Sequence, residues 1–266
     1  MKFFLRAIGY VFVVYLILSG IAQILGTKEA GDVPCKDKVE VINRQNDRRH
    51  ERAWKLNDKT TAFCATYHSV EKLSLAVGQR RNNMILQVDD YENFWGSVYF
   101  NLVEDSKAYI DFIVDSLGDI SNQKELSRMQ LAELIVTFVQ DIPYSYVLPS
   151  DCANFESGDS PCIGNIALGL LSPYEFLHSL YGDCDTRAVL IYTMLEELGF
   201  EPMIVVSDEY AHAMLALNVP SVGDHLLFKG RKYYFWETTA KGWPIGMLPP
   251  NANNINYWKI ALVNES

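Results

Sequence analysis

The apolar residues of the chain follow helical spacing up to about residue 200 and strand-like patterns beyond it. Spacings of three and four predict helices at residues 69–83, 90–103, 106–117, 124–140 and 184–198, with a short helix from Pro173. An apolar run and alternating apolar residues then predict strands at 203–207, 213–219, 226–228, 232–236 and 257–263, with a hairpin turn at Lys229-Gly230. Helices followed by strands in this order indicate an α+β fold.

Two element boundaries carry clear signals. The stretch from Ser172 to Glu175 is a capping box with proline at the first helical position, and Pro143 ends the preceding helix because proline disfavours helix in the residue before it.

Residues 33–69 are polar and predict one candidate strand, at 60–67. We therefore divide the chain into an N-terminal segment at 1–26, a helical segment at 27–120 packed on the core, and a catalytic domain at 121–266.

The start of the helix at 184–198 is the strongest chemical signal. Gly182 forms a turn that delivers Asp183 and Cys184 to the first helical turn. Unpaired backbone N–H groups and the helix dipole favour a negative charge there, so the Cys184 thiolate forms more easily. Asp183 and Asp185 oppose this effect, because their charges raise the pKa of the thiol. A Cys184 thiolate therefore needs a nearby cation.

Residues 1–26 differ from the rest of the chain. Lys2 and Arg6 are their only charged residues, and the apolar or neutral stretch that follows is about 20 residues long, enough to span a bilayer. The segment is either a cleaved signal peptide or an uncleaved signal anchor with its positive end inside the cell, and its length favours the anchor. In both cases we expect the body outside the cytoplasm, in the periplasm or at the cell exterior.

The charge of the body excludes some partners. Without residues 1–26 the chain keeps 21 basic and 33 acidic residues, a net charge of −12. This charge argues against nucleic-acid binding through phosphates and against a polybasic contact with anionic lipid. One basic cluster is interpreted as a solvated helix face near the membrane; it consists of Arg44, Arg48, Arg49, His50 and Arg52. The expected partners are a protein or peptide substrate and, through the N-terminal helix, the membrane.

The cysteine count is odd. In an oxidising compartment, five cysteines indicate pairs and one free thiol. Cys152 and Cys162 lie in a loop rich in turn formers and are candidates for one disulfide. Cys35 and Cys64 would form the second. This pairing leaves Cys184 free at its helix start.

Cys184, His212 and Glu237 together offer the groups that thiol-dependent acyl transfer needs. Cys184 would be the nucleophile, His212 on a strand the base, and Glu237 at the end of a later strand the carboxylate that orients the imidazole. A protonated His212 would also supply the cation that the thiolate needs. In the alternative interpretation, Cys184 is a small buried hydrophobic residue, His212 is a core histidine and Glu237 is a surface charge. His225 is the best substitute base, whereas His178 is expected to pack its helix, and no Cys or His pair near Cys184 has zinc spacing.

Four stretches resemble the transglutaminase-like superfamily: VQDIPY at 139–144, SPYEFLHSLYGDCDTRA at 172–188, AHAMLAL at 211–217 and YYFWETTAKGWPIG at 233–246. They cover a little under half of the chain, and the GDCD turn is the most specific. The resemblance implies a papain-like core, in which a helix with an N-terminal cysteine packs on an antiparallel sheet that carries the histidine and the acid. It implies Cys184 as nucleophile, His212 as general base and Glu237 as third residue. Many members have aspartate at the third position, and the surroundings of Glu237 resemble bacterial and archaeal members that use glutamate.

The tetrahedral intermediate of such a reaction needs oxyanion donors, each worth about 3 kcal/mol when well placed. The Cys184 backbone N–H is the first, and Gln140 and Tyr144 are candidates for the second. The sequence thus predicts a cysteine hydrolase that cleaves peptide or isopeptide bonds, without a cofactor or a metal. A protein-glutamine transglutaminase, which transfers the acyl group to an amine, and a non-catalytic transglutaminase-like binding or scaffold domain are the alternatives.

Overall fold

The computed structural model describes residues 35–56, 62–86, 90–156 and 158–264. Contacts divide the chain into two compact units, residues 1–34 and residues 35–266, and every described residue belongs to the second. The predicted membrane segment at 1–26 lies outside the described residues. No described helix is long and apolar enough to cross a membrane. The described part is a mixed α+β structure whose two larger sheets are antiparallel, in agreement with the predicted α+β class.

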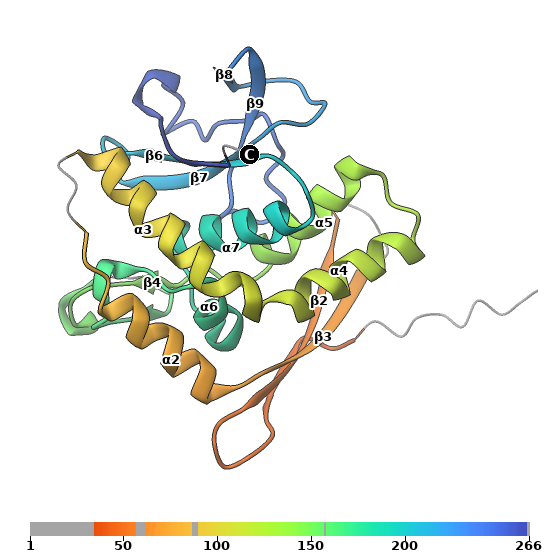
Figure 1. Cartoon of the computed structure of the whole chain (residues 1–266), viewed down its shortest axis with the longest axis vertical. Helices are drawn as coiled ribbons and strands as arrows, with labels where there is room; N and C mark the ends of the chain where they lie inside the picture. Colours follow the sequence, from red (N-terminus) through yellow and green to blue (C-terminus); the bar gives the residue numbers. More distant parts are fainter. Residues whose placement is uncertain (1–34, 57–61, 87–89, 157, 265–266) are drawn as a thin grey trace, which may run out of the picture. The chain divides into compact units, whose positions relative to one another are not determined.

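A five-stranded antiparallel sheet near the C-terminus carries two of the candidate site residues. Its strands lie in the order β10-β6-β7-β9-β8 (Figure 1). They are β6 (Pro202–Ser207), β7 (His212–Leu217), β8 (His225–Phe228), β9 (Arg231–Trp236) and β10 (Lys259–Val263). Each strand agrees with a predicted one to within a residue or two, and β8 and β9 form the predicted hairpin.

Helix α7 (Cys184–Glu197) lies at the centre of the larger apolar core. Every residue from 186 to 195 is buried. The helix packs against β6 and β7 of the sheet and against three helices, which are α3 (Tyr91–Ser106), α5 (Arg128–Gln140) and α6 (Pro173–Ser179). Because α7 is enclosed on all sides, its first turn, with Cys184, is held on a rigid element.

The two remaining α-helices of the described chain lie on either side of α3 in the sequence. They are α2 (Glu71–Asn82) and α4 (Asp111–Gln123), with a 3₁₀ turn before α4 that delays the helix predicted from residue 106. Helix α3 crosses β10 at Gly96, where a Cβ would lie 2.1 Å from the Ala261 carbonyl oxygen. Gly96 weakens the helical pattern of the sequence, but the close approach of the strand requires it.

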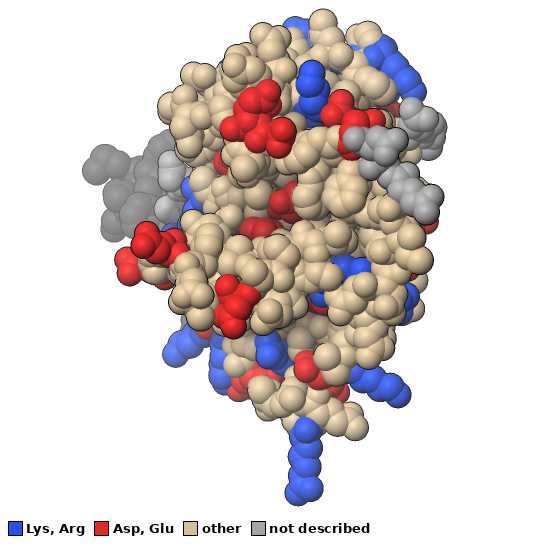
Figure 2. All heavy atoms as spheres, turned by 90° about the vertical axis from the view of Figure 1, so that its left-hand side faces the viewer, with Lys and Arg blue, Asp and Glu red and all other residues tan. Residues whose placement is uncertain are grey.

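The interpretation of the basic cluster as a helix face is wrong, because this part of the chain forms a three-stranded antiparallel sheet. Strands β1 (Lys38–Val41), β2 (Arg48–Lys55) and β3 (Ala62–Ser69) pair in that order, so the segment at 27–120 contains a sheet in addition to its helices. Alternation along β2 turns His50 and Arg52 inward, where both are buried. Lys and Arg side chains project from the lower end of Figure 2, the end at which the β1–β2 hairpin lies in Figure 1.

Two disulfides join the predicted partners. Cys35–Cys64 ties the start of the described chain to β3, and Cys152–Cys162 closes the loop between β4 (Tyr146–Val147) and β5 (Cys162–Ile163). Among the described residues, which include all five cysteines, Cys184 alone is free. Two disulfides indicate an oxidising, extracytoplasmic location.

Candidate active site

Asp183 and Gly182 set the position of Cys184 at the start of α7. The Asp183 carboxylate accepts a hydrogen bond from the Thr186 backbone N–H at 3.2 Å and caps the helix, so Cys184 is its first residue. A Cβ at Gly182 would lie 2.7 Å from the Phe176 ring of α6. Only glycine lets the turn pass this ring, and the predicted turn and helix start are confirmed.

Arg187 fixes the segment around Cys184, and the sequence interpretation missed this residue. Its guanidinium is fully buried and donates to four carbonyl oxygens, those of Gly182 (3.0 Å), Val139 (2.9 Å), Ile142 (2.7 Å) and Pro143 (2.8 Å). These hydrogen bonds tie the start of α7 to the end of α5. An arginine inside a run of otherwise uncharged core residues was the available signal, because a buried charge is costly unless it is hydrogen-bonded.

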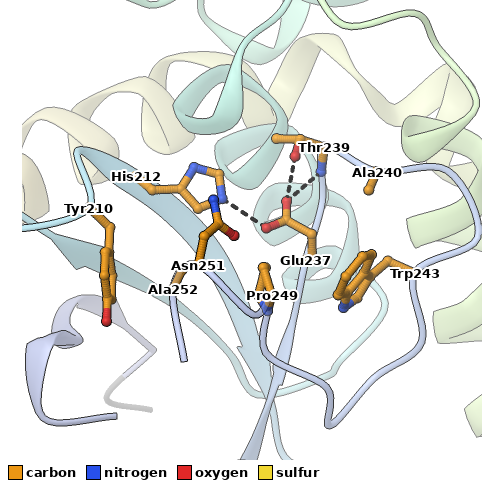
Figure 3. Close-up of a pocket in the computed structure, with 9 residues that line it drawn as sticks. All are labelled: Tyr210, His212, Glu237, Thr239, Ala240, Trp243, Pro249, Asn251 and Ala252. Carbon is orange, nitrogen blue, oxygen red and sulfur yellow. Dashed lines mark hydrogen bonds and ion pairs between the residues drawn. The ribbon is translucent and has the colours of Figure 1, made fainter. Parts of the chain in front are cut away.

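His212 and Glu237 form a hydrogen-bonded pair on neighbouring strands (Figure 3). His212 opens β7, and Glu237 directly follows β9. The His212 Nε2–H group donates to Glu237 Oε2 at 2.8 Å, while Glu237 Oε1 accepts from the backbone N–H (2.8 Å) and the hydroxyl (2.6 Å) of Thr239. Because Nε2 is bound to the carboxylate, Nδ1 is the imidazole nitrogen left to act as a base.

The environment of Glu237 keeps it ionised. Burial acts to raise the pKa of Glu237, but hydrogen bonds from His212 and Thr239 outweigh burial and leave this pKa below its ordinary value. The Glu237 side chain is 4% exposed and that of His212 is 20% exposed. A buried carboxylate therefore orients an imidazole that solvent can still reach.

A cavity of about 330 Å³ opens beside this pair. In Figure 3, Tyr210 and Asn251 lie on the His212 side of the cavity and Trp243 lies on the Glu237 side. The full lining consists of Tyr210, His212, Glu237, Thr239, Ala240, Trp243, Pro249, Asn251 and Ala252. Cys184 does not line this cavity, so the cavity belongs to the base side of the candidate site.

The Cys184 thiol lies next to β7 but points to a different partner. Its Sγ donates to Asp185 Oδ2 at 3.4 Å, and the Tyr99 hydroxyl of α3 donates to the other oxygen of the same carboxylate. The main chain of Ala213, the residue after His212, also hydrogen-bonds to the sulfur. Within the described part of the chain, no hydrogen bond joins Cys184 to His212. The candidate nucleophile thus lies beside the strand of its base, with its thiol turned to Asp185.

Burial and neighbouring carboxylates keep this thiol protonated. Burial raises the pKa of Cys184 well above its ordinary value, and the Asp185 and Asp183 carboxylates raise it further, whereas the Ala213 hydrogen bond lowers it. Burial, followed by the Asp185 charge, raises the pKa of Asp183 to about 7, and burial also raises the pKa of Asp185. The two aspartates thus act on the pKa of the thiol in the predicted direction.

The two candidate oxyanion donors differ in their surroundings. The Gln140 amide nitrogen donates to the carbonyl oxygens of Glu237 (2.7 Å) and Trp243 (3.2 Å), so its two N–H groups are already used. The Gln140 side chain thus holds the loop that carries Glu237, and its role as an oxyanion donor stays a prediction. The Tyr144 hydroxyl makes no hydrogen bond to another described residue. Burial, and then the charge of Cys184, raise the pKa of Tyr144, as expected for a hydroxyl near the sulfur.

Two other histidines considered from the sequence lie elsewhere. His225 is on β8, two strands from β7, and its Nδ1 donates to the Gly223 carbonyl oxygen at 2.9 Å. It therefore cannot replace His212 as the base. His178 of α6 is buried and hydrogen-bonded to the Ser69 hydroxyl at 2.8 Å and to the Glu71 carboxylate, so it packs its helix as predicted.

Comparisons with protein-family models, curated proteins and solved structures find no match. In the described ranges, no group of three or more His, Cys, Asp and Glu side chains is arranged to hold a metal ion. The site thus consists of a thiol at a helix start, an imidazole–carboxylate pair carried by two neighbouring strands, and the cavity beside that pair.

Proposed function

We propose that the protein is a thiol-dependent acyl-transfer enzyme that hydrolyses peptide or isopeptide bonds. The main support is the hydrogen-bonded pair of His212 and Glu237, together with Cys184 at the start of a helix that packs on the His212 strand. In a papain-like core of the transglutaminase-like type, the cysteine would begin a helix, and the histidine and the acid would follow later in the chain on an antiparallel sheet. The resemblance of the four sequence stretches adds to this support.

In the proposed reaction, the Cys184 thiol turns from Asp185 to His212 and gives its proton to Nδ1. The thiolate attacks the amide carbonyl carbon, and the backbone N–H of Cys184 and the Tyr144 hydroxyl stabilise the oxyanion. The C–N bond then breaks, and the leaving amine takes the proton from Nδ1. Water next attacks the thioester and gives a proton to His212. The C–S bond breaks, and the released thiolate recovers that proton.

The site would work on the outer side of a membrane. The two disulfides indicate an extracytoplasmic location, and in the sequence Cys35 of one disulfide follows the apolar segment by a few residues. We therefore propose that residues 1–26 tether the enzyme to the membrane. Its substrate would then be a peptide or protein of the same compartment.

A non-catalytic binding domain is the second candidate, and the hydrogen bond from Cys184 to Asp185 favours it. A thiol that burial and two carboxylates keep protonated is a poor nucleophile until it contacts an imidazole. Transfer of the acyl group to an amine, as in a transglutaminase, would use the same residues as hydrolysis and differ only in the second nucleophile.

Alkylation of the full chain by iodoacetamide across a pH series separates the two candidates. Cys184 is the free cysteine, so the rate of alkylation reports on it. The enzyme requires a rate at neutral pH above that of an ordinary thiol of pKa about 8.5, and a fall of about tenfold or more in His212→Ala. His225→Ala is the matched control and should keep the wild-type rate. Equal rates in the wild type and His212→Ala would refute the enzyme and support the binding domain.

A further inference from the structure

Three aromatic rings form a continuous row that runs from the candidate site to the surface. The ring centroids of Tyr144 and Tyr146 are 5.2 Å apart and those of Tyr146 and Phe155 are 4.8 Å apart, both with edge-to-face geometry. Tyr144 and Tyr146 are half-buried, and Phe155 is 38% exposed. Exposed aromatic surface of this kind is typical of binding sites, because a large ring gains contact area at little cost in conformational entropy.

The inner end of the row lies beside the nucleophile. The backbone N–H of Ser145 donates to the Gly182 carbonyl oxygen at 3.2 Å, and the Arg187 guanidinium carbon lies 5.6 Å from the centroid of the Tyr144 ring. Pro143 and Ser145 line a separate cavity. Since side chains alternate along an extended segment, Tyr144 and Tyr146 face the opposite side from that cavity, and the charge of Cys184 raises the pKa of Tyr144.

The loop that presents the row is held at several points. Tyr146 of β4 pairs with Cys162 of β5, and the Tyr146 backbone N–H donates to the Pro161 carbonyl oxygen at 2.8 Å. The Cys152–Cys162 disulfide closes the loop, and the Phe155 backbone N–H donates to the Cys152 carbonyl oxygen at 3.0 Å. A row that is ordered before binding loses little entropy when a ligand arrives.

The charge of the loop narrows the class of ligand. Residues 144–164 include Asp151, Glu156 and Asp159 and contain no lysine or arginine. Negative charges beside the row disfavour an acidic group on the ligand. The row is therefore suited to an apolar side chain of a neutral or basic peptide.

We infer that Tyr144, Tyr146 and Phe155 bind an aromatic or large aliphatic side chain of the substrate, on the acyl side of the bond to be cleaved. The row lies on the nucleophile side, whereas the cavity beside His212 and Glu237 lies on the side from which the leaving amine takes its proton. The assignment to the acyl side rests on the proposed function. The binding of an apolar side chain next to Cys184 is independent of the proposed function.

Peptidyl chloromethyl ketones with Phe, Gly or Glu next to the ketone test this inference on the full chain, with Cys184 alkylation as the readout. The Phe probe should react about tenfold or more faster than the Gly probe, and the Glu probe more slowly than the Gly probe. Phe155→Ala should lower the ratio of the Phe rate to the Gly rate several-fold, and Phe155→Leu should retain more of it. Phe100→Ala, at an exposed aromatic residue of α3, should leave the ratio unchanged.

The outcomes separate this inference from the proposed function. Equal Phe and Gly rates in the wild type, or a ratio that Phe155→Ala does not change, would overturn the inference even if alkylation depends on His212. The opposite result is a Phe preference that depends on Phe155, combined with alkylation rates that His212→Ala does not change. That result would support the binding row and overturn the proposed enzyme.

Discussion

Asparagine in place of Asp185 should make the Cys184 thiol more acidic. The sulfur lies 3.4 Å from Asp185 Oδ2, and removal of the negative charge of Asp185 favours the thiolate. Two unit charges at this separation repel by about 1 kcal/mol in bulk water and by about 5 kcal/mol at an effective dielectric constant of about 20. One pKa unit corresponds to about 1.4 kcal/mol, so the pKa of Cys184 should fall by about 1 to 3.5 units in Asp185→Asn.

Asp183→Asn is the matched control for this substitution. Asparagine is a good N-cap residue, so the hydrogen bond to Thr186 and the start of α7 should be kept. The Asp183 charge raises the pKa of Cys184 less than the Asp185 charge does. The pKa of Cys184 should therefore fall in Asp183→Asn as well, but by less than in Asp185→Asn.

The assay is the rate of alkylation by iodoacetamide from about pH 5 to about pH 10, whose midpoint gives the pKa of the thiol. Circular dichroism of each variant checks that the fold is kept. A midpoint in Asp185→Asn that equals or exceeds that of the wild type would show that the nearest carboxylate does not raise the pKa of the thiol, and would contradict this prediction.

Two further predictions concern stability. Burial, followed by nearby positive charges, lowers the pKa of His50 from 6.5 to about 3, so the unfolded state binds more protons between these values and stability falls as the pH drops below 6.5. At about pH 4.5 the protonation of His50 in the unfolded state lowers the free energy of unfolding by about 2.7 kcal/mol. Urea unfolding at about pH 7.5 and at about pH 4.5 should therefore show a smaller loss of unfolding free energy in His50→Gln than in the wild type. Gly96→Ala should destabilise the protein by about 1–3 kcal/mol, because its Cβ meets the Ala261 carbonyl oxygen. Gly118→Ala in α4, where the nearest atom is 4.0 Å away, should be neutral or stabilising; equal melting temperatures for the two variants would contradict the packing of α3 on β10.

The sequence predicts the second half of the fold better than the first. The capping box at Ser172, the turn at Gly182 and the hairpin at Lys229-Gly230 are local signals, and each is found where it was expected. Buried strands such as β6 also carry an unbroken apolar run. Local chemistry and the apolar pattern agree in this half, and agreement between levels makes a segment predictable.

The candidate strand at 60–67 is found as β3, but β1 and β2 were not predictable from local pattern, because polar residues occupy inward positions of β2. Arg52 is buried and forms an ion pair with Asp37 at 2.7 Å, and His50 hydrogen-bonds to Ser69 at 3.1 Å. Ser69 in turn contacts His178, which lies 109 residues further along the chain. When the inward residues of a strand are polar, the sequence does not show an alternation between polar and apolar residues. The hydrogen-bond and ion-pair partners of these inward residues come together only in the folded chain.

The candidate site shows the same division between local and distant information. Sequence and resemblance suggested His212 and Glu237, and the structure joins them by a hydrogen bond. The direction of the Cys184 thiol was not predictable, because Tyr99 holds the Asp185 carboxylate from a helix 86 residues earlier in the chain. An aromatic residue on a helical stripe reads as core, and its hydroxyl partner is set by how α3 packs on α7.

The charges around Cys184 explain why its position at a helix start is insufficient for reactivity. Asp183 and Asp185 flank the thiol, Glu237 follows β9 and binds His212 of β7, and the Arg187 guanidinium donates to four carbonyl oxygens. A thiolate adds one more negative charge to this group, and the imidazolium of His212 is the cation that can offset it. Glu237 sets the orientation of that imidazole. In the proposed enzyme, the reactivity of Cys184 would therefore depend on the β7–β9 pair more than on the dipole of its own helix.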